Sequence, residues 1–347
     1  MSLLDVTSSG QYFKQTANID LSNESWTPFG FGGYFDGNGM TISNVKIDLS
    51  NWKYVGFFSE LSSGGELKNV RLENVDIKGE SYVGGLVGYT KPNSSISNSY
   101  ASGNVTGAAY HVGGLVGFAE GNISNSYTSS SVSGSNDVGG LVGLAIGSIS
   151  NSYATGSISG SYSVGGLVGD AAFTSSISNS YALGNVTGAA DSDYVGGLVG
   201  KAYGLISYSH ALGSVTGSSS VGGLVGISFS NIYNSYASGN VTGVNSVGGF
   251  VGSANSNSII YNTYSSGSVT GSLNVGGFMG FINVNSNISI SNSYYDREIT
   301  NLPDNKKGIP RTTTEMKTGT PSETIYTGWD PAIWNFGDDT DYPTLKK

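Results

Sequence analysis

The sequence predicts an all-β protein that folds as a single parallel β-solenoid of about nine coils, capped at both ends. Three observations lead to this fold class. One six-residue motif returns at a nearly constant spacing, glycine supplies 54 of 347 residues, and only 11% of the residues are charged. Glycine is thus about twice as frequent as usual, while charged residues are less than half as frequent. This composition favours strands and turns over helices.

The repeated motif is V-G-G-[LF]-[VM]-G, and it occurs eight times. Its copies begin at Val83, Val112, Val138, Val164, Val195, Val221, Val247 and Val275. Four of the seven spacings between them are 26 residues, and the longer spacings contain insertions of loop-like composition. The sequence VGFF at residues 55–58 resembles a degenerate ninth copy. The unit is therefore a coil of 26 residues, which is too short to bury its own apolar face and must stack on its copies.

Each coil contains three extended pieces, approximately VGGLVGxA, xISNSYA and GxVTG, which are separated by glycine or polar corners. No helical periodicity of any length interrupts them. In a parallel stack, each residue lies about 4.8 Å from the same residue of the next coil. A charged residue that returned in every coil would form a ladder of like charges. The low charge content therefore follows from the predicted architecture.

The two ends differ from the repeats. We assign residues 1–53 to an N-terminal cap and the first coil or coils, residues 54–294 to the repeats, and residues 295–347 to a C-terminal capping segment. Caps are needed because an open terminal coil presents unpaired backbone groups. All four tryptophans lie in the two end segments, and the pattern Thr312-x-x-Glu315 predicts a helix that begins with a capping box.

Charge and cysteine content exclude several classes of protein. The chain has 15 basic and 24 acidic residues, so a nucleic-acid partner is not expected. It has no cysteine, which excludes a disulfide-stapled scaffold. No apolar run reaches the length of a membrane span, and residues 1–10 lack the features of a signal peptide. We expect that an exported protein of this kind carries its signal or anchor outside these residues, or uses another route.

One column of aromatic residues is the main candidate for a ligand surface. Its members occupy the last aromatic position of xISNSYA: Tyr100, Tyr127, Tyr153, Tyr181, His210, Tyr236 and Tyr264, with Tyr294 in the last coil. If the rings point outward, they form a stripe that suits sugar rings. If they point inward or lie along a corner, they form a stacking ladder. The second interpretation is favoured, but a corner between Ile96 and Tyr100 decides the direction and leaves it open.

A column of asparagines precedes the aromatic column, beginning with Asn98, and Tyr208 replaces the asparagine in the fifth member. Stacked amides can hydrogen-bond along a solenoid axis.

The insertions supply a second set of candidate contacts, because insertions in a solenoid tend to gather on one face. These loop candidates are Lys91, Asn93, Tyr110, His111, Asp191 and Asp193.

No catalytic, metal or cofactor site is expected. The VGGLVG motif recurs eight times without a following helix, unlike a phosphate-binding loop, so its glycines are interpreted as corner and close-approach residues. No cluster of histidine, cysteine and carboxylates has the spacing of a metal site. Asp137 and Asp170 occupy different places relative to their VGG motifs, so nothing pairs them as the two carboxylates of a glycosidase.

The motif YVGGLVG at residues 82–88, followed by NSYASGNVTG at residues 98–107, resembles the GLUG-motif repeat family of prokaryotic surface proteins. Both flanks are similar to the segments that precede and close such repeats, with matching residues at 26–30, 33–44, 313–317, 328–330 and 342–345. The resemblance implies a cell-surface or secreted, adhesin-like repeat region. It implies no catalytic residues.

We therefore expect a non-enzymatic extracellular or particle-surface solenoid, which serves as an adhesin-like stalk or as a receptor- or glycan-binding module. Its expected partners are a host or neighbouring cell surface with a glycan or protein receptor, and self-association is a further possibility. Three alternatives remain open: a polysaccharide-degrading solenoid enzyme, a phage or viral fibre component located at the virion surface, and an ice-binding solenoid. The ice-binding alternative depends on one threonine or serine per coil, in a column expected at a corner: Thr106, Ser133, Ser159, Thr187, Thr216, Thr242 and Thr270.

Overall fold

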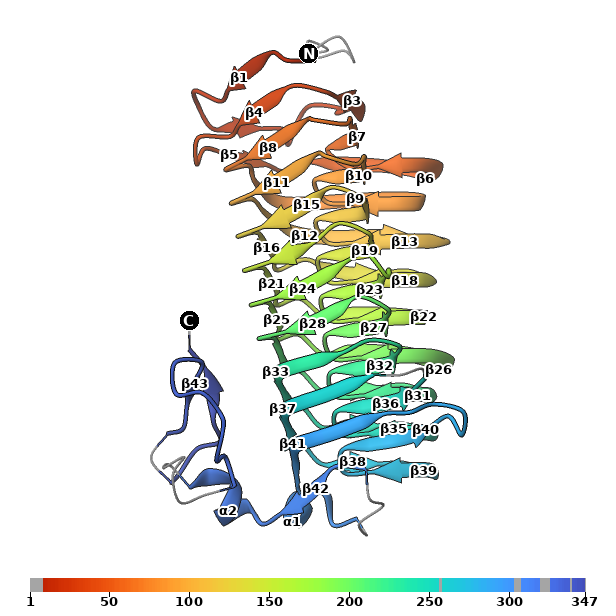
Figure 1. Ribbon diagram of the computed structural model, residues 1–347. Helices are drawn as coiled ribbons and strands as arrows, with labels where there is room; N and C mark the ends of the chain where they lie inside the picture. Colours follow the sequence, from red (N-terminus) through yellow and green to blue (C-terminus); the bar gives the residue numbers. More distant parts are fainter. Residues whose placement is uncertain (1–8, 256–257, 303–306, 319–324, 338, 347) are drawn as a thin grey trace.

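The computed structural model describes residues 9–255, 258–302, 307–318, 325–337 and 339–346. Residues 1–8, which contain most of the segment considered for a signal peptide, lie outside this range. The chain winds into one elongated parallel β-solenoid, with the early residues at one end and β41 (Ser289–Asp296) and β42 (Ile309–Arg311) at the other (Figure 1). The predicted all-β solenoid of about nine coils is confirmed.

One face of the solenoid is a sheet of ten strands, with one strand from each coil and parallel pairing throughout. In order, the strands are β3 (Phe29–Phe31), β7 (Phe58–Leu61), β10 (Val87–Thr90), β14 (Val116–Ala119), β19 (Val142–Ala145), β23 (Val168–Ala171), β27 (Val199–Ala202), β32 (Val225–Ser228), β36 (Val251–Ala254) and β40 (Met279–Ile282). The first strand, β3, comes from the segment assigned to the N-terminal cap and first coil.

The remaining faces belong to one continuous sheet of 32 strands. Its strands in the repeat region are β8 (Glu66–Lys68), β9 (Arg71–Gly84), β11 (Ser95–Ser97), β12 (Tyr100–Gly107), β13 (Tyr110–Gly113), β15 (Asn122–Ser124), β16 (Tyr127–Thr128), β17 (Ser131–Ser133), β18 (Asn136–Gly139), β20 (Ile149–Ser150), β21 (Tyr153–Ala154), β22 (Ile158–Gly165), β24 (Ser176–Ser178), β25 (Tyr181–Ala182), β26 (Val186–Gly196), β28 (Leu205–Ser207), β29 (His210–Ala211), β30 (Val215–Thr216), β31 (Ser219–Gly222), β33 (Ile232–Ala237), β34 (Val241–Thr242), β35 (Asn245–Gly248), β37 (Ile259–Ser265), β38 (Val269–Thr270), β39 (Leu273–Gly276) and β41 (Ser289–Asp296).

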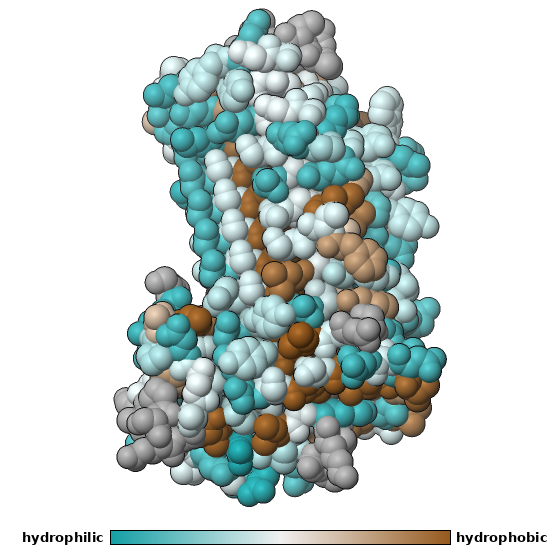
Figure 2. All heavy atoms as spheres, in the orientation of Figure 1, coloured by the Kyte–Doolittle hydropathy of each residue, from teal (hydrophilic) through white to brown (hydrophobic). Residues whose placement is uncertain are grey.

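The coils stack in register, so that equivalent residues are direct neighbours. Ile96 pairs with Ile123, and Val112 pairs with Val138. As a result, residues of similar hydropathy form columns along the long axis, which Figure 2 shows on one face. The valine, leucine, isoleucine and alanine columns point inward and form one continuous buried core.

Two corners in each coil adopt the left-handed backbone conformation. The first corner is the asparagine position, as at Asn98 with a φ of 49°. The second is the residue before the VGG motif, as at His111 with a φ of 58°. Asparagine tolerates this conformation better than most residues, which explains its place at the first corner. In this asparagine column, an amide bond between neighbouring coils joins Asn262 to Asn234.

The VGG glycines do not adopt positive φ angles; they are required because backbone segments approach closely. A Cβ atom on Gly139 would lie 2.0 Å from the Val142 carbonyl oxygen and 2.7 Å from the Gly169 nitrogen. Both distances are far below van der Waals contact. The interpretation of these glycines as close-approach residues is confirmed.

A column of buried serines was not anticipated from the sequence. The hydroxyl of Ser126 donates to the Ser124 carbonyl at 2.8 Å and accepts the backbone N–H of Ser99 at 3.1 Å. The same pair of bonds recurs at Ser152 and Ser180. These hydroxyls satisfy backbone groups at the asparagine corner, which cannot pair within a strand.

At the N-terminal end, the first residues continue the solenoid. β1 (Tyr12–Lys14) pairs in parallel with β4 (Tyr34–Asp36), and β2 (Ile19–Asp20) pairs with β5 (Thr41–Ser43). β6 (Lys46–Val55) then pairs with β9.

At the C-terminal end, β42 (Ile309–Arg311) adds one strand to β41, between the short helices α1 (Arg297–Thr300) and α2 (Thr313–Lys317). The capping box predicted at Thr312 and Glu315 is present at the start of α2. The chain then turns back beside the solenoid, where β43 (Trp334–Asn335) and β44 (Thr344–Leu345) form an antiparallel pair (Figure 1).

We predict that Gly139→Ala lowers the free energy of unfolding by roughly 1–3 kcal/mol, because the added methyl group forces two backbone segments apart. The matched control is Gly32→Ala, where the nearest atom to the new Cβ is 3.6 Å away and the change should be close to neutral. Thermal unfolding followed by circular dichroism measures both. Equal midpoints for the two variants would contradict the close-approach role.

Candidate functional site: the aromatic ladder and its cleft

The aromatic column lies on the outside of the solenoid, directly after the asparagine corner. Ile96 is buried before the corner, and Tyr100 is half-buried after it. The left-handed turn at Asn98 breaks the alternation of side chains along the strand, so both residues take the positions their chemistry favours. The corner on which the direction of the rings depended is therefore present.

The rings form a continuous stack. Neighbouring ring centroids from Tyr100 to Tyr264 are 4.5–5.0 Å apart, and most neighbouring planes are within 10° of parallel. Each ring within the stack therefore has both faces covered by its neighbours, while its edge and polar atoms point away from the core. A sugar ring cannot lie flat on these covered faces. The ladder offers a row of ring edges and hydroxyls instead.

The C-terminal segment covers one end of this ladder. Tyr236, Tyr264 and Tyr294 are buried, and they form a second hydrophobic core with Trp329, Trp334 and other residues of the segment. The hydroxyl of Tyr264 donates to the Pro343 carbonyl at 2.6 Å. Burial raises the pKa of Tyr236 to about 12. From Tyr100 to His210, by contrast, the ladder is half-buried.

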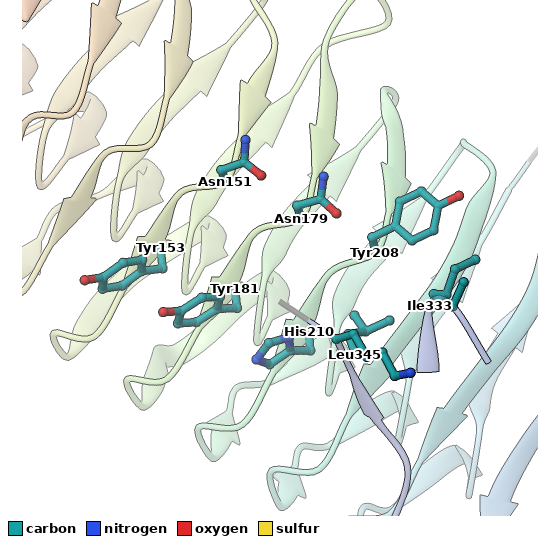
Figure 3. A pocket seen from close by; sticks show the side chains of 10 residues that line it. Asn151, Tyr153, Asn179, Tyr181, Tyr208, His210, Ile333 and Leu345 are labelled. Carbon is teal, nitrogen blue, oxygen red and sulfur yellow. The ribbon is translucent and has the colours of Figure 1, made fainter. Parts of the chain in front are cut away.

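A cleft of about 650 Å³ lies where this cover ends (Figure 3). Its volume is within the range of small-molecule sites. The solenoid contributes two parallel columns, and the C-terminal segment forms the opposite wall. The lining residues are Asn151, Tyr153, Asn179, Tyr181, Tyr208 and His210 from the solenoid, and Ala332, Ile333, Leu345 and Lys346 from the segment.

The cleft contains the one coil in which the motif ISNSYA reads ISYSHA, at residues 206–211. Both departures, Tyr208 and His210, line the cleft. Tyr208 has a φ of 50° at the corner that asparagine occupies in the neighbouring coils. A left-handed conformation costs a residue of this kind about 1–2 kcal/mol. The sequence therefore contained a signal for this site, because Tyr208 and His210 both depart from the repeat in the same coil.

The loop candidates are not brought to this cleft. Lys91 forms an ion pair with Glu60 at 2.7 Å, and Asn93 is exposed in the same loop. Tyr110, His111, Asp191 and Asp193 lie on another ridge, which contains the corner before the VGG motif. Tyr110 is 54% exposed, Asp191 is exposed and Asp193 is half-buried.

On this second ridge, four charged or titratable side chains meet. His111 Nδ1 lies 2.9 Å from a carboxylate oxygen of Asp137, and Lys201 Nζ lies 3.6 Å from one of Asp170. Burial and the nearby charge of Asp137 raise the pKa of Asp170 to about 6, although Lys201 opposes this rise. The strand that carries Asp137 contacts the strand that carries Asp170, so the two carboxylates influence each other although they occupy different places relative to their VGG motifs. Each carboxylate also faces a basic partner, His111 for Asp137 and Lys201 for Asp170.

The column of Thr106 lies on strands β12, β17, β22, β26, β30, β34 and β38, and in four of them it is the last residue, so the expected corner follows the column and does not contain it. A second column of small polar residues runs beside it, two residues earlier in each coil. Its members are Asn104, Ser131, Ser157, Asn185, Ser214, Asn240 and Ser268. The residue between the two columns, such as Val105, is buried. The face is therefore uncharged over seven coils.

Within the described parts of the chain, no group of three or more histidine, cysteine or acidic side chains could hold a metal ion. No helix in the same residues has the length and apolar character needed to cross a membrane.

Comparisons with known proteins identify the repeats. The GLUG motif matches residues 79–106, 108–133, 134–159, 160–187, 191–216 and 217–242. Halomucin from Haloquadratum walsbyi is 40% identical over 126 residues, which are 36% of this chain and 1% of halomucin. A crystal structure from Bacteroides ovatus, described as a candidate immunoglobulin A1 protease, is 21% identical. It has a TM-score of 0.39, with 98% of this chain and 86% of the other covered.

We predict that Asp170→Asn flattens the dependence of stability on pH. The folded-state pKa of Asp170 lies above its ordinary value, so this group favours folding at pH 4 and below and loses that contribution as the pH rises through about 6. A rise from 3.8 to about 6 corresponds to roughly 3 kcal/mol. Asparagine mimics the neutral acid, so the variant should unfold at a higher temperature than the parent at pH 8.

Thermal unfolding at pH 5 and pH 8 measures this difference, and Asp191→Asn in the exposed loop is the control. The raised pKa of Asp170 would be contradicted if the unfolding temperature changed equally between pH 5 and pH 8 in the parent and in Asp170→Asn.

Proposed function

We propose that this protein, whose residues 79–242 are six GLUG motifs, is a non-enzymatic module of a cell-surface, secreted or particle-surface protein. The solenoid serves as a rigid adhesin-like stalk that presents a receptor- or glycan-binding face. The chain spans about 1% of the length of halomucin, so a module within a much longer protein is consistent with this role.

The observation that carries the proposal is the half-exposed part of the ladder and its cleft. There, ring edges, hydroxyls and amides converge beside an apolar wall, which is the usual composition of a binding site. The surface is also rigid, because every ladder residue is fixed by in-register strands on both sides.

The lining of the cleft supports binding rather than hydrolysis. Glycosidases require two carboxyl groups on opposite sides of the scissile bond. The described lining residues include no carboxylate, and Lys346 is their one permanently charged side chain. Asp137 and Asp170 lie on the other ridge, where His111 and Lys201 engage them.

We predict that beads coated with the protein adhere to cells or to immobilised glycans through the cleft. The double variant Asn151→Gly, Asn179→Gly removes two cleft amides and retains residues that accept the left-handed conformation, so adhesion should fall several-fold. The matched control is Asn98→Gly, Asn125→Gly, in the same column outside the cleft. No adhesion by the parent protein to any cell or glycan would leave only a scaffold role.

The two-column polar face favours ice binding as a second candidate function. Its columns repeat at about 4.8 Å along the axis and about 6.6 Å across it, which makes a regular, uncharged array of hydroxyls and amides. We predict for this candidate that the protein shapes ice crystals and produces thermal hysteresis, and that Thr187→Lys abolishes both. Unshaped ice in a nanolitre osmometer would remove this function.

A further inference from the structure

We propose that the cleft is a saccharide subsite in which Tyr208 provides the platform for an uncharged sugar ring. This inference rests on the proposed binding function, and it adds the ligand class and the residue that selects it.

The first argument is the availability of the ring. The ladder residues Tyr153 and Tyr181 have stacked neighbours, and so cannot offer a face to a ligand. Tyr208 is 36% exposed, and the structure shows no contact between its ring and another aromatic ring within the described residues. Its neighbours in the corner column are the smaller Asn179 and Asn234. Tyr208 is therefore the aromatic side chain of the cleft with a face open to a ligand.

The second argument is the backbone position of Tyr208. Tyrosines also occupy left-handed corners on the other ridge, where Tyr54 stacks on Tyr82 at 4.7 Å and Tyr194 contacts Tyr162 at 4.9 Å. Those rings gain packing in return for the unfavourable conformation. Tyr208 gains no such ring contact, and residues held in a strained backbone conformation cluster at ligand-binding and active sites.

The third argument is the polar complement around the ring. Asn151 and Asn179 are exposed and lie in one column with Tyr208, while Tyr153, Tyr181 and His210 form the adjacent column (Figure 3). Amides both donate and accept hydrogen bonds, as sugar hydroxyls do. An aromatic face beside such groups suits the polarised C–H surface of a sugar ring.

The fourth argument concerns charge. The described lining has no carboxylate to bind a cationic ligand, and the ammonium group of Lys346 donates to the Pro331 carbonyl at 2.6 Å. Ile333 and Leu345 close the opposite side with apolar surface (Figure 3). Most of the described lining is uncharged, which matches a neutral sugar, and the charge of Lys346 is the one feature of it that would favour an acidic sugar.

The test uses Tyr208→Asn, which restores the motif of the neighbouring coils and relieves the left-handed tyrosine. The probes are neutral hexose and N-acetylhexosamine oligomers, with uronic acid oligomers and unstructured peptides as competing classes. We expect the parent protein to bind a neutral oligomer and Tyr208→Asn to bind it about tenfold more weakly, which corresponds to the loss of one stacking contact. Tyr208→Phe should retain the affinity, because it retains the ring.

Two controls separate a binding effect from a folding effect. The unfolding temperature of Tyr208→Asn should equal or exceed that of the parent, and Tyr110→Asn, an exposed tyrosine on the other ridge, should leave affinity unchanged. Unaltered oligosaccharide binding by Tyr208→Asn would overturn the subsite and leave the proposed function standing. Preference for peptides or acidic oligomers would overturn the ligand class alone. A parent that binds no probe and no cell would overturn both proposals.

Discussion

The structure depends on one constraint: each residue lies in register above its own copy in the preceding coil. The principal neighbour of Val112 is Val138, and the principal neighbour of Tyr153 is Tyr181. Under this constraint, small apolar residues build the core, serines satisfy the corners, and aromatic rings stack. A column of identical charges is unfavourable, so a charged residue fits best beside an opposite charge in the next coil, as Lys201 does beside Asp170. The low charge, the abundant glycine and the repeated aromatics of the sequence are consequences of the same stacking.

Most of the fold could be predicted because the constraint leaves a periodic trace. The spacing of the VGG motif predicts the coil, and the composition predicts the absence of long helices. The direction of the ladder could not be predicted in the same way. It depends on a left-handed turn at Asn98, and asparagine also occurs on strands and in other turns. The same limitation applied to the Thr106 column, which lies on strands and gains a parallel partner column in the folded chain.

The candidate site was less accessible to sequence reasoning, since it depends on contacts without a period. The wall formed by Ile333 and Leu345 reaches the cleft because the last part of the chain turns back. It lies against solenoid residues that are more than 100 positions earlier in the sequence. Nothing in the repeats specifies that return. The meeting of Asp137 with Asp170 likewise depends on the path of the second corner. The departure from the repeat at Tyr208 and His210, however, is visible in the sequence. The structure adds that both residues line the cleft.

The return of the C-terminal segment along the ladder also sets the size of the surface that remains open. The segment is tied to the last coils through Tyr236, Tyr264 and Tyr294, so the covered length is set by the segment and not by the number of repeats. Coils added or lost before Tyr236 change the open length alone, in steps of about 4.8 Å. Chains with different numbers of repeats would therefore share the same covered end, and the length of their open ladder would increase with each added coil.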